Sequence, residues 1–204
     1  MDISILRKYF IMGSQDCKRN PEDILREAIE AGITAFQFRE KGVGSLKGKE
    51  KIQLGKKLRQ ICKDYQIPFI INDDSVLIEI LHADGIHVGQ DDISVEILRE
   101  KHPDLMIGLS VGTEAELEKS NINIVDYIGV GPVYSTSSKA DASAAIGTDW
   151  ITSLKKRYPE LPIVGIGGIN EKNAHSVLDA GADGVSVISA ITKSKNIRAT
   201  VQAI

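Results

Sequence analysis

Short apolar runs recur along this chain roughly every 20 to 25 residues. Each run is too short for an ordinary helix, and most are followed by an amphipathic stretch that opens with a helix-starting residue. Parallel strands need a crossover, usually a helix, between one strand and the next. The spacing therefore predicts repeated strand–helix units around a parallel sheet.

Eight strands are predicted, with a helix after nearly every one. The strands are Tyr9–Met12, Thr34–Phe38, Phe69–Ile71, Gly85–Val88, Met106–Leu109, Tyr127–Val130, Ile163–Ile166 and Gly184–Val187. The helices are Pro21–Ala31, Gly48–Tyr65, Ser75–Leu81, Ser94–Lys101, Glu114–Ser120, Asp149–Tyr158 and Glu171–Ala180, with a last one toward the C-terminus. An open doubly wound sheet would also fit, but no G-x-G-x-x-G follows the first strand. The pattern favours a single-domain (β/α)8 TIM barrel over residues 1–204.

Composition and charge exclude several classes of function. The 25 basic and 28 acidic residues give a net charge of −3 without a like-charge block, which argues against a nucleic-acid or membrane-surface protein. No stretch approaches the roughly 18 apolar residues of a membrane span, and Met1–Phe10 has no signal-like apolar core. Cys17 and Cys62 lack metal or disulfide spacing. We expect a cytoplasmic protein, with monomer and homo-oligomer both open.

The second predicted strand ends in Gln37-Phe38-Arg39-Glu40-Lys41. Alternate residues of a strand point the same way, so positions 37, 39 and 41 project an amide and two cations together. In a barrel these strand ends converge on one mouth. The segment therefore predicts an anion site, and the alternative is a surface where Arg39 and Lys41 pair with Glu40.

Acidic clusters follow the third and fourth strands. They are Asn72-Asp73-Asp74 and Gln90-Asp91-Asp92. Neighbouring strands lie about 5 Å apart, so one carboxylate from each cluster could hold a magnesium ion against phosphate oxygens. The alternative is that Asp73 or Asp92 caps the helix that follows it.

Three later loops have the composition of phosphate sites. The loop Gly131–Lys139 is rich in hydroxyls, and Gly165–Asn170 and Ser186–Ala190 follow the last two strands, where barrels commonly bind phosphate. A flexible loop, an exposed Lys139 ion pair or a plain tight turn are the alternatives. His87 belongs to no histidine cluster, so a packed or hydrogen-bonded role is favoured over a ligand role.

Six segments together resemble the thiamine phosphate synthase family across almost the whole chain. They are Gln37-Phe38-Arg39-Glu40-Lys41, Asn72-Asp73-Asp74, His87-Val88-Gly89-Gln90-Asp91-Asp92, Gly131-Pro132-Val133-Tyr134, Gly165-Ile166-Gly167-Gly168-Ile169 and Val187-Ile188-Ser189-Ala190-Ile191. One such motif would be weak, but six in order at the same predicted mouth are specific. The resemblance implies a transferase of thiamine biosynthesis that joins hydroxymethylpyrimidine pyrophosphate to thiazole phosphate with the help of Mg²⁺.

The resemblance also assigns residues to each ligand. It implies that the pyrimidine pyrophosphate is bound by Gln37, Phe38, Arg39, Glu40, Lys41, Asn72, Ser110 and Lys139, with Arg39, Lys41, Ser110 and Lys139 acting in catalysis. It implies that Asp73 and Asp92 hold the metal, and that the thiazole phosphate is bound by Thr136, Ser137, Ser138, Gly168, Ile188 and Ser189.

Two other functions fit the same barrel. A thiazole tautomerase paralogue resembles the synthase but is expected to lack the paired carboxylates and to use a histidine after the fifth strand, where this chain has Gly112. A catalytically silent phosphate-binding protein is the second, because fold alone does not fix function. Asp73 and Asp92 favour the synthase.

Overall fold

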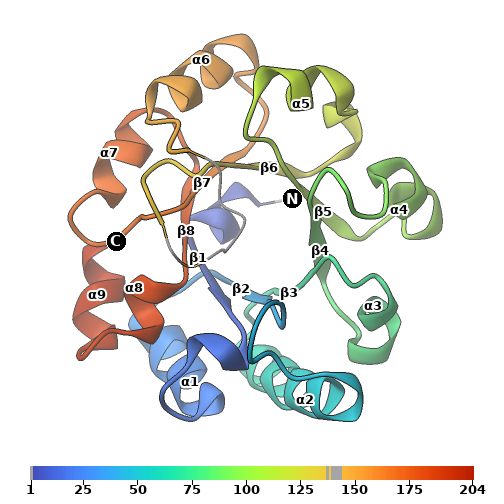
Figure 1. The fold of residues 1–204 in the computed structure, drawn as a ribbon, viewed down its shortest axis with the longest axis vertical. Coiled ribbons are helices and arrows are strands. Elements are labelled where there is room, and N and C mark those ends of the chain that lie inside the picture. The colour runs from blue at the N-terminus through green and yellow to red at the C-terminus, as the bar shows by residue number, and fades with distance from the viewer. Residues whose placement is uncertain (1, 137, 139–143) are drawn as a thin grey trace.

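The structure is a computed structural model that describes residues 2–136, 138 and 144–204. Its strands form a closed parallel barrel in which each strand pairs with the next and β8 pairs with β1, with the helices ranged outside (Figure 1). The strands are β1 (Lys8–Met12), β2 (Ala35–Phe38), β3 (Phe69–Asn72), β4 (Gly85–Val88), β5 (Met106–Ser110), β6 (Tyr127–Val130), β7 (Ile163–Ile166) and β8 (Gly184–Val187). The predicted (β/α)8 barrel is confirmed.

The helices follow the strands in the predicted order. They are α1 (Pro21–Ala31), α2 (Gly48–Asp64), α3 (Val76–Leu81), α4 (Val95–Lys101), α5 (Glu114–Lys119), α6 (Asp149–Arg157), α7 (Ala174–Asp179), α8 (Ser189–Thr192) and α9 (Ile197–Ala203). The clearest boundary difference is α7, predicted to begin at Glu171. Asn170 and Asn173 accept hydrogen bonds from nearby backbone N–H groups and hold a turn there, so the helix begins later.

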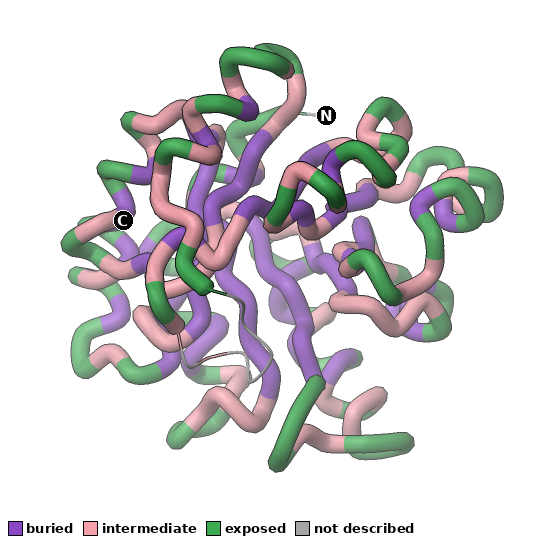
Figure 2. The backbone as a smooth tube through the Cα atoms, turned by 45° about the horizontal axis from the view of Figure 1, so that its top comes forward, coloured by how far each residue is buried: buried purple, intermediate pink, exposed green. Residues whose placement is uncertain are grey.

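Side chains of each strand alternate between two apolar regions. On β1, Phe10 and Met12 pack in the core between the strands and the helices, while Tyr9 and Ile11 pack in the smaller cluster inside the barrel. Figure 2 shows the buried strands at the centre of the molecule, with most of the exposed chain around them. The barrel interior is therefore filled with side chains, and any ligand site must lie at its end.

A repeated contact ties neighbouring strands together at the N-terminal end of the barrel. The side chain of the residue before each even-numbered strand accepts a hydrogen bond. The donor is the backbone N–H of a residue at the start of the preceding strand. In return, the backbone N–H of the accepting residue donates to the carbonyl oxygen of the donor residue. The acceptors are Thr34, Asp84, Asp126 and Asp183, and the donors are Lys8, Phe69, Ile107 and Ile163, each at 2.8 Å.

Three of these acceptors are carboxylates, and each pairs with a cation from the outer helices. The pairs are Arg59–Asp84, Arg99–Asp126 and Lys155–Asp183, at 2.7 to 3.0 Å. A charged acceptor strengthens the hydrogen bond that it receives. The acidic residues at this end thus fix strand register, and the opposite end is left for chemistry.

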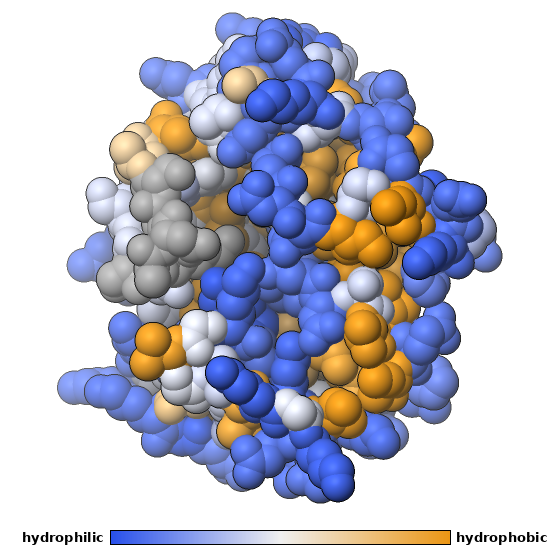
Figure 3. All heavy atoms as spheres, turned by 45° about the vertical axis from the view of Figure 1, so that its right-hand side comes forward, coloured by the Kyte–Doolittle hydropathy of each residue, from blue (hydrophilic) through white to orange (hydrophobic). Residues whose placement is uncertain are grey.

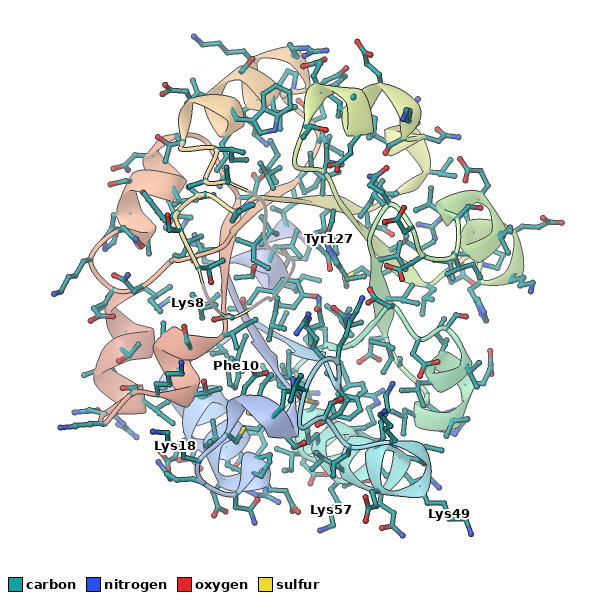
Figure 4. All side chains as sticks on the ribbon, in the orientation of Figure 1. Lys8, Phe10, Lys18, Lys49, Lys57 and Tyr127 are labelled. Atoms are coloured by element: carbon teal, nitrogen blue, oxygen red, sulfur yellow. The ribbon has the colours of Figure 1, made fainter. Side chains whose placement is uncertain are left out.

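The outer surface is mostly polar. Lys49 and Lys57 of α2 project outward (Figure 4), and both are exposed. Figure 3 shows hydrophobic atoms gathered among hydrophilic ones on the side of α3 and α4. Val76, Ile80 and Ile97 are the exposed hydrophobic residues of those two helices. In the described part of the chain, no helix combines the length and apolar character needed to cross a membrane.

Candidate active site

A cavity of about 560 Å³ opens at the C-terminal ends of the strands. It gathers residues from seven of the eight strand ends, β2 to β8, or the loops that follow them. Of the residues predicted for the site, Arg39, Lys41, Asn72, Asp73, Asp92, Ser110, Thr136, Ser138, Gly168, Ile188 and Ser189 line it. Ser137 and Lys139 lie outside the described residues. The cavity size suits small-molecule ligands rather than a polymer.

The loop after β2 brings two cations to the cavity. Arg39 is 7% exposed, and no described carboxylate forms an ion pair with its guanidinium group. The Nζ atom of Lys41 lies 2.5 Å from Oδ2 of Asp73. A buried cation without an ion pair favours an anionic ligand. The predicted alternative, in which both cations pair with Glu40, is wrong.

The two predicted metal carboxylates face the same cavity. Asp73 accepts from Lys41, and Asp92 Oδ2 accepts from the backbone N–H of Gly89 at 2.8 Å. Neither acts as a helix cap, because Ser75 and Ser94 occupy the N-cap positions of α3 and α4. The capping alternative is therefore wrong.

The donor chemistry of this wall fits a magnesium ion. Magnesium takes one or two carboxylates and fills its remaining positions with water and phosphate oxygens, so Asp73 and Asp92 suffice. The ammonium group of Lys41 lies beside these carboxylates. Its hydrogen bond to Asp73, with the added charge of Asp92, raises the pKa of Lys41. No larger group of metal-binding side chains gathers among the described residues.

Three residues of the predicted pyrimidine-pyrophosphate set do not line this cavity. Phe38 points outward into the core and stacks on Phe69, with ring centroids 6.0 Å apart. Gln37 points into the barrel interior, beneath the cavity, where it is 2% exposed. Glu40 is turned away from the cavity by hydrogen bonds from the loop after β1 and from the loop after β2 itself.

Glu40 holds those two loops together. Its carboxylate accepts from the backbone N–H of Ser14, from Ser14 Oγ at 3.1 Å and from the backbone N–H of Leu46 at 2.7 Å. Glu40 is buried, with 8% of the residue exposed. Glu40 thus supports the segment that carries Arg39 and Lys41.

Glu40→Gln is expected to lower the free energy of unfolding by about 2 kcal/mol, because an amide replaces a buried charged acceptor and turns N–H groups toward N–H groups. Urea denaturation measures the change. Glu27→Gln is the matched control, since Glu27 pairs with Arg19 on the surface and should cost no more than about 1 kcal/mol. Equal stability of the two variants would contradict the role of Glu40.

The opposite wall combines a glycine turn with hydroxyl groups. Gly168 has a φ of +64°, and a Cβ there would lie 2.6 Å from the backbone oxygen of Ser135. The loop after β7 therefore packs directly on the loop after β6. Ser138 Oγ lies 3.3 Å from Ser189 Oγ, so hydroxyls from two loops meet beside the glycine. This arrangement suits a phosphate group.

Three residues outside the predicted site set also line the cavity, and the hydrogen-bonded role favoured for His87 is confirmed. His87 lines it and is hydrogen-bonded, through Nε2 to Ser110 Oγ at 2.9 Å and through Nδ1 to the hydroxyl of Tyr127 at 3.1 Å. Its place on an inward-facing position of β4 was the available signal. Gln90 and Glu116 also line the cavity, and Glu116 accepts from the backbone N–H of Gly112 at 2.6 Å.

Comparisons with known proteins identify the family of the chain. A family model described as thiamine monophosphate synthase matches residues 8–191. A thiamine-phosphate synthase of Oceanobacillus iheyensis is 58% identical over 201 residues, covering 98% of each chain. One from Staphylococcus epidermidis is 52% identical over 203 residues, covering 98% of this chain and 96% of the relative.

Solved structures extend the likeness to three dimensions. A thiamine phosphate pyrophosphorylase from Pyrococcus furiosus superposes with a TM-score of 0.86 at 32% identity, covering 98% of this chain and 94% of the other. Phosphoribosyl anthranilate isomerase from Thermotoga maritima reaches 0.70 at 15% identity, which shows the shared barrel alone. By the matching family model and the curated relatives, the chain belongs to the thiamine monophosphate synthase family.

Proposed function

We propose that this chain joins the pyrimidinylmethyl group of hydroxymethylpyrimidine pyrophosphate to thiazole phosphate, or its carboxylated form, and releases thiamine phosphate and pyrophosphate. Family membership makes it a transferase of thiamine synthesis. One observation carries the assignment to two phosphorylated substrates. A single cavity has cations and paired carboxylates on one wall, and a glycine turn with hydroxyls on the other.

The pyrophosphate belongs on the wall formed by β2, β3 and β4. Arg39 and Lys41 supply positive charge and Asn72 supplies an amide. Asp73 and Asp92 would hold the magnesium ion, which when bound neutralises phosphate oxygens. Lys41 would then exchange its contact with Asp73 for one with the substrate.

The thiazole phosphate belongs on the wall formed by the loops after β6, β7 and β8. Backbone N–H groups near Gly168 and the hydroxyls of Thr136, Ser138 and Ser189 offer donors to its oxygens. Holding the phosphate there would aim the thiazole nitrogen across the cavity at the pyrimidine. Such positioning replaces a bimolecular encounter with a near-attack geometry.

The reaction needs no protein nucleophile. The bond between the pyrimidine's methylene carbon and the bridging oxygen breaks first, and its electron pair leaves with pyrophosphate. The thiazole nitrogen then donates its lone pair to the resulting pyrimidine cation, and a carboxylated substrate afterwards loses CO₂. Arg39 and Lys41 stabilise the charge that grows on the departing group, and Ser110 donates a hydrogen bond to the pyrimidine substrate.

The test is direct measurement of pyrophosphate and thiamine phosphate from purified protein, both substrates and Mg²⁺, with an EDTA control. Metal-dependent formation of both products supports the proposal. Folded protein that binds a substrate but forms neither product would overturn it in favour of a tautomerase or a silent binding protein.

Ser189→Ala is expected to raise the KM for thiazole phosphate about tenfold, because one hydrogen bond to a charged oxygen is lost. The KM for the pyrimidine substrate should stay within about twofold. Ser194→Ala is the matched control, since Ser194 bonds Thr200 between α8 and α9 and does not line the cavity. Initial-rate measurements with each substrate varied in turn check the prediction. An effect on the pyrimidine KM alone would contradict the assigned wall.

A further inference from the structure

A chain of hydrogen bonds runs through the barrel interior to the cavity floor. Gln37 Nε2 donates to the hydroxyl of Tyr9 at 2.8 Å, and the hydroxyls of Tyr9 and Tyr127 lie 2.9 Å apart. The Tyr127 hydroxyl lies 3.1 Å from Nδ1 of His87, and His87 Nε2 lies 2.9 Å from Ser110 Oγ. Figure 4 shows Tyr127 within the ring of strands.

Two glycines make room for the end of this chain. His87, Gly108 and Tyr127 stand at one level on β4, β5 and β6, so Tyr127 reaches His87 across Gly108. A Cβ at Gly108 would lie 2.4 Å from the Tyr127 hydroxyl and 2.5 Å from His87 Nδ1. A Cβ at Gly129 would lie 2.9 Å from His87 Cε1. The His87 ring and the Tyr127 hydroxyl therefore fit only because Gly108 and Gly129 have no side chain.

One arrangement of hydrogens satisfies the whole chain in a single direction. The Gln37 amide nitrogen donates to the Tyr9 oxygen, and the Tyr9 hydrogen then goes to Tyr127. Burial raises the pKa of both tyrosines, so both keep their protons. In this arrangement Tyr127 donates to Nδ1 of His87. A neutral His87 then carries its hydrogen on Nε2 and donates it to Ser110 Oγ.

We propose that Gln37, Tyr9 and Tyr127 hold His87 in its Nε2–H tautomer, and that His87 in turn directs the hydroxyl hydrogen of Ser110 into the cavity. This inference rests on the proposed function, in which Ser110 donates to the pyrimidine substrate. The tyrosines and His87 are positioning residues that act through Ser110. Their effect is to keep that donor aligned before the substrate arrives, so that no reorientation is needed during reaction.

The tautomer can be measured without substrates by ¹⁵N NMR of the histidine side chains. His87→Gln identifies the signals by their loss among the four histidines. The expected result is a protonated Nε2 and an unprotonated Nδ1 in the wild-type protein, and a mixture of tautomers in Tyr127→Phe. A wild-type His87 protonated on Nδ1, or on both nitrogens at neutral pH, would overturn the inference.

Turnover tests the consequence for Ser110. Tyr127→Phe is expected to lower kcat about tenfold, with the KM for thiazole phosphate within about twofold of wild type. Tyr9→Phe should have a smaller effect, because Tyr127 can still donate to His87. Tyr65→Phe is the matched control on the outer surface, where only a 3.3 Å bond to Glu30 is lost. A wild-type kcat in Tyr127→Phe, together with an altered His87 tautomer, would also overturn the proposed role of His87 in aligning Ser110.

Replacing His87 separates positioning from packing. His87→Gln keeps an N–H donor near the place of Nε2 and should retain several-fold more kcat than His87→Leu, which keeps only bulk. Equal losses of kcat in His87→Gln and His87→Leu would contradict a positioning role for His87. This comparison still tests the inference if Tyr127→Phe does not fold. A wild-type protein with the expected tautomer but no product would instead refute the proposed function and leave the hydrogen-bonded chain standing.

Discussion

Asp73→Asn is expected to lower metal-dependent turnover about 100- to 1,000-fold. The substitution keeps the size of the side chain but removes the charge of one of the two carboxylates proposed to hold the metal, Asp73 and Asp92. It also removes the carboxylate that now holds Lys41 at 2.5 Å. Initial rates over a range of Mg²⁺ concentrations measure the loss, and the half-saturating Mg²⁺ concentration should rise with it.

Asp74→Asn is the control for that variant. Asp74 is the next residue, yet it does not line the cavity and pairs with Lys51 at 2.8 Å. Its variant should keep turnover within about twofold, since this half-buried ion pair lies outside the cavity. The metal role of Asp73 fails if the two variants lose equal activity, or if Asp73→Asn keeps the wild-type response to magnesium.

Arg39→Gln should also lower kcat about 100- to 1,000-fold. Arg39 is a buried cation facing the cavity, so its charge is poorly screened by water and acts strongly on a nearby anion. That charge matters most as pyrophosphate departs, because negative charge is then growing on the leaving oxygen. Single-turnover rates with both substrates saturating isolate this step from binding.

Arg157→Gln is the control variant, because it replaces an arginine that does not line the cavity. Arg157 lies on the surface at the end of α6, where it pairs with Glu114 and contacts the ring of Tyr158. Turnover should be unchanged in this variant. A wild-type single-turnover rate for Arg39→Gln would remove Arg39 from the departure step and leave it at most a binding role.

The fold was predictable because its signal is local and repeated. Strands such as β4 and β5 are short apolar runs followed by a helix start, and parallel strands joined in this way have few available topologies. The boundary of α7 was missed because its start depends on the side chains of Asn170 and Asn173, which stabilise a turn over a helical first turn. Polar residues at strand ends were assigned to one mouth for a related reason, since closing the barrel brings all those ends together.

Side-chain direction within the site was harder to predict. Glu40 lies between two residues that line the cavity, yet it bonds Ser14 and Leu46 from separate loops. Asp84, Asp126 and Asp183 are acidic like Asp73, but they sit at the opposite end of the barrel and hold strand register. Residue type alone does not separate a binding carboxylate from a structural one.

The sequence by itself determined the strand–helix order, the barrel and the strand ends that carry polar groups, because hydrophobic periodicity and glycine placement act over short distances. Only the tertiary structure decided which of those groups meet. Lys41 contacts Asp73 across 32 positions, and Tyr9 contacts Tyr127 across 118. Such contacts depend on barrel closure, on register and on the space left at Gly108, none of which is encoded within a single segment.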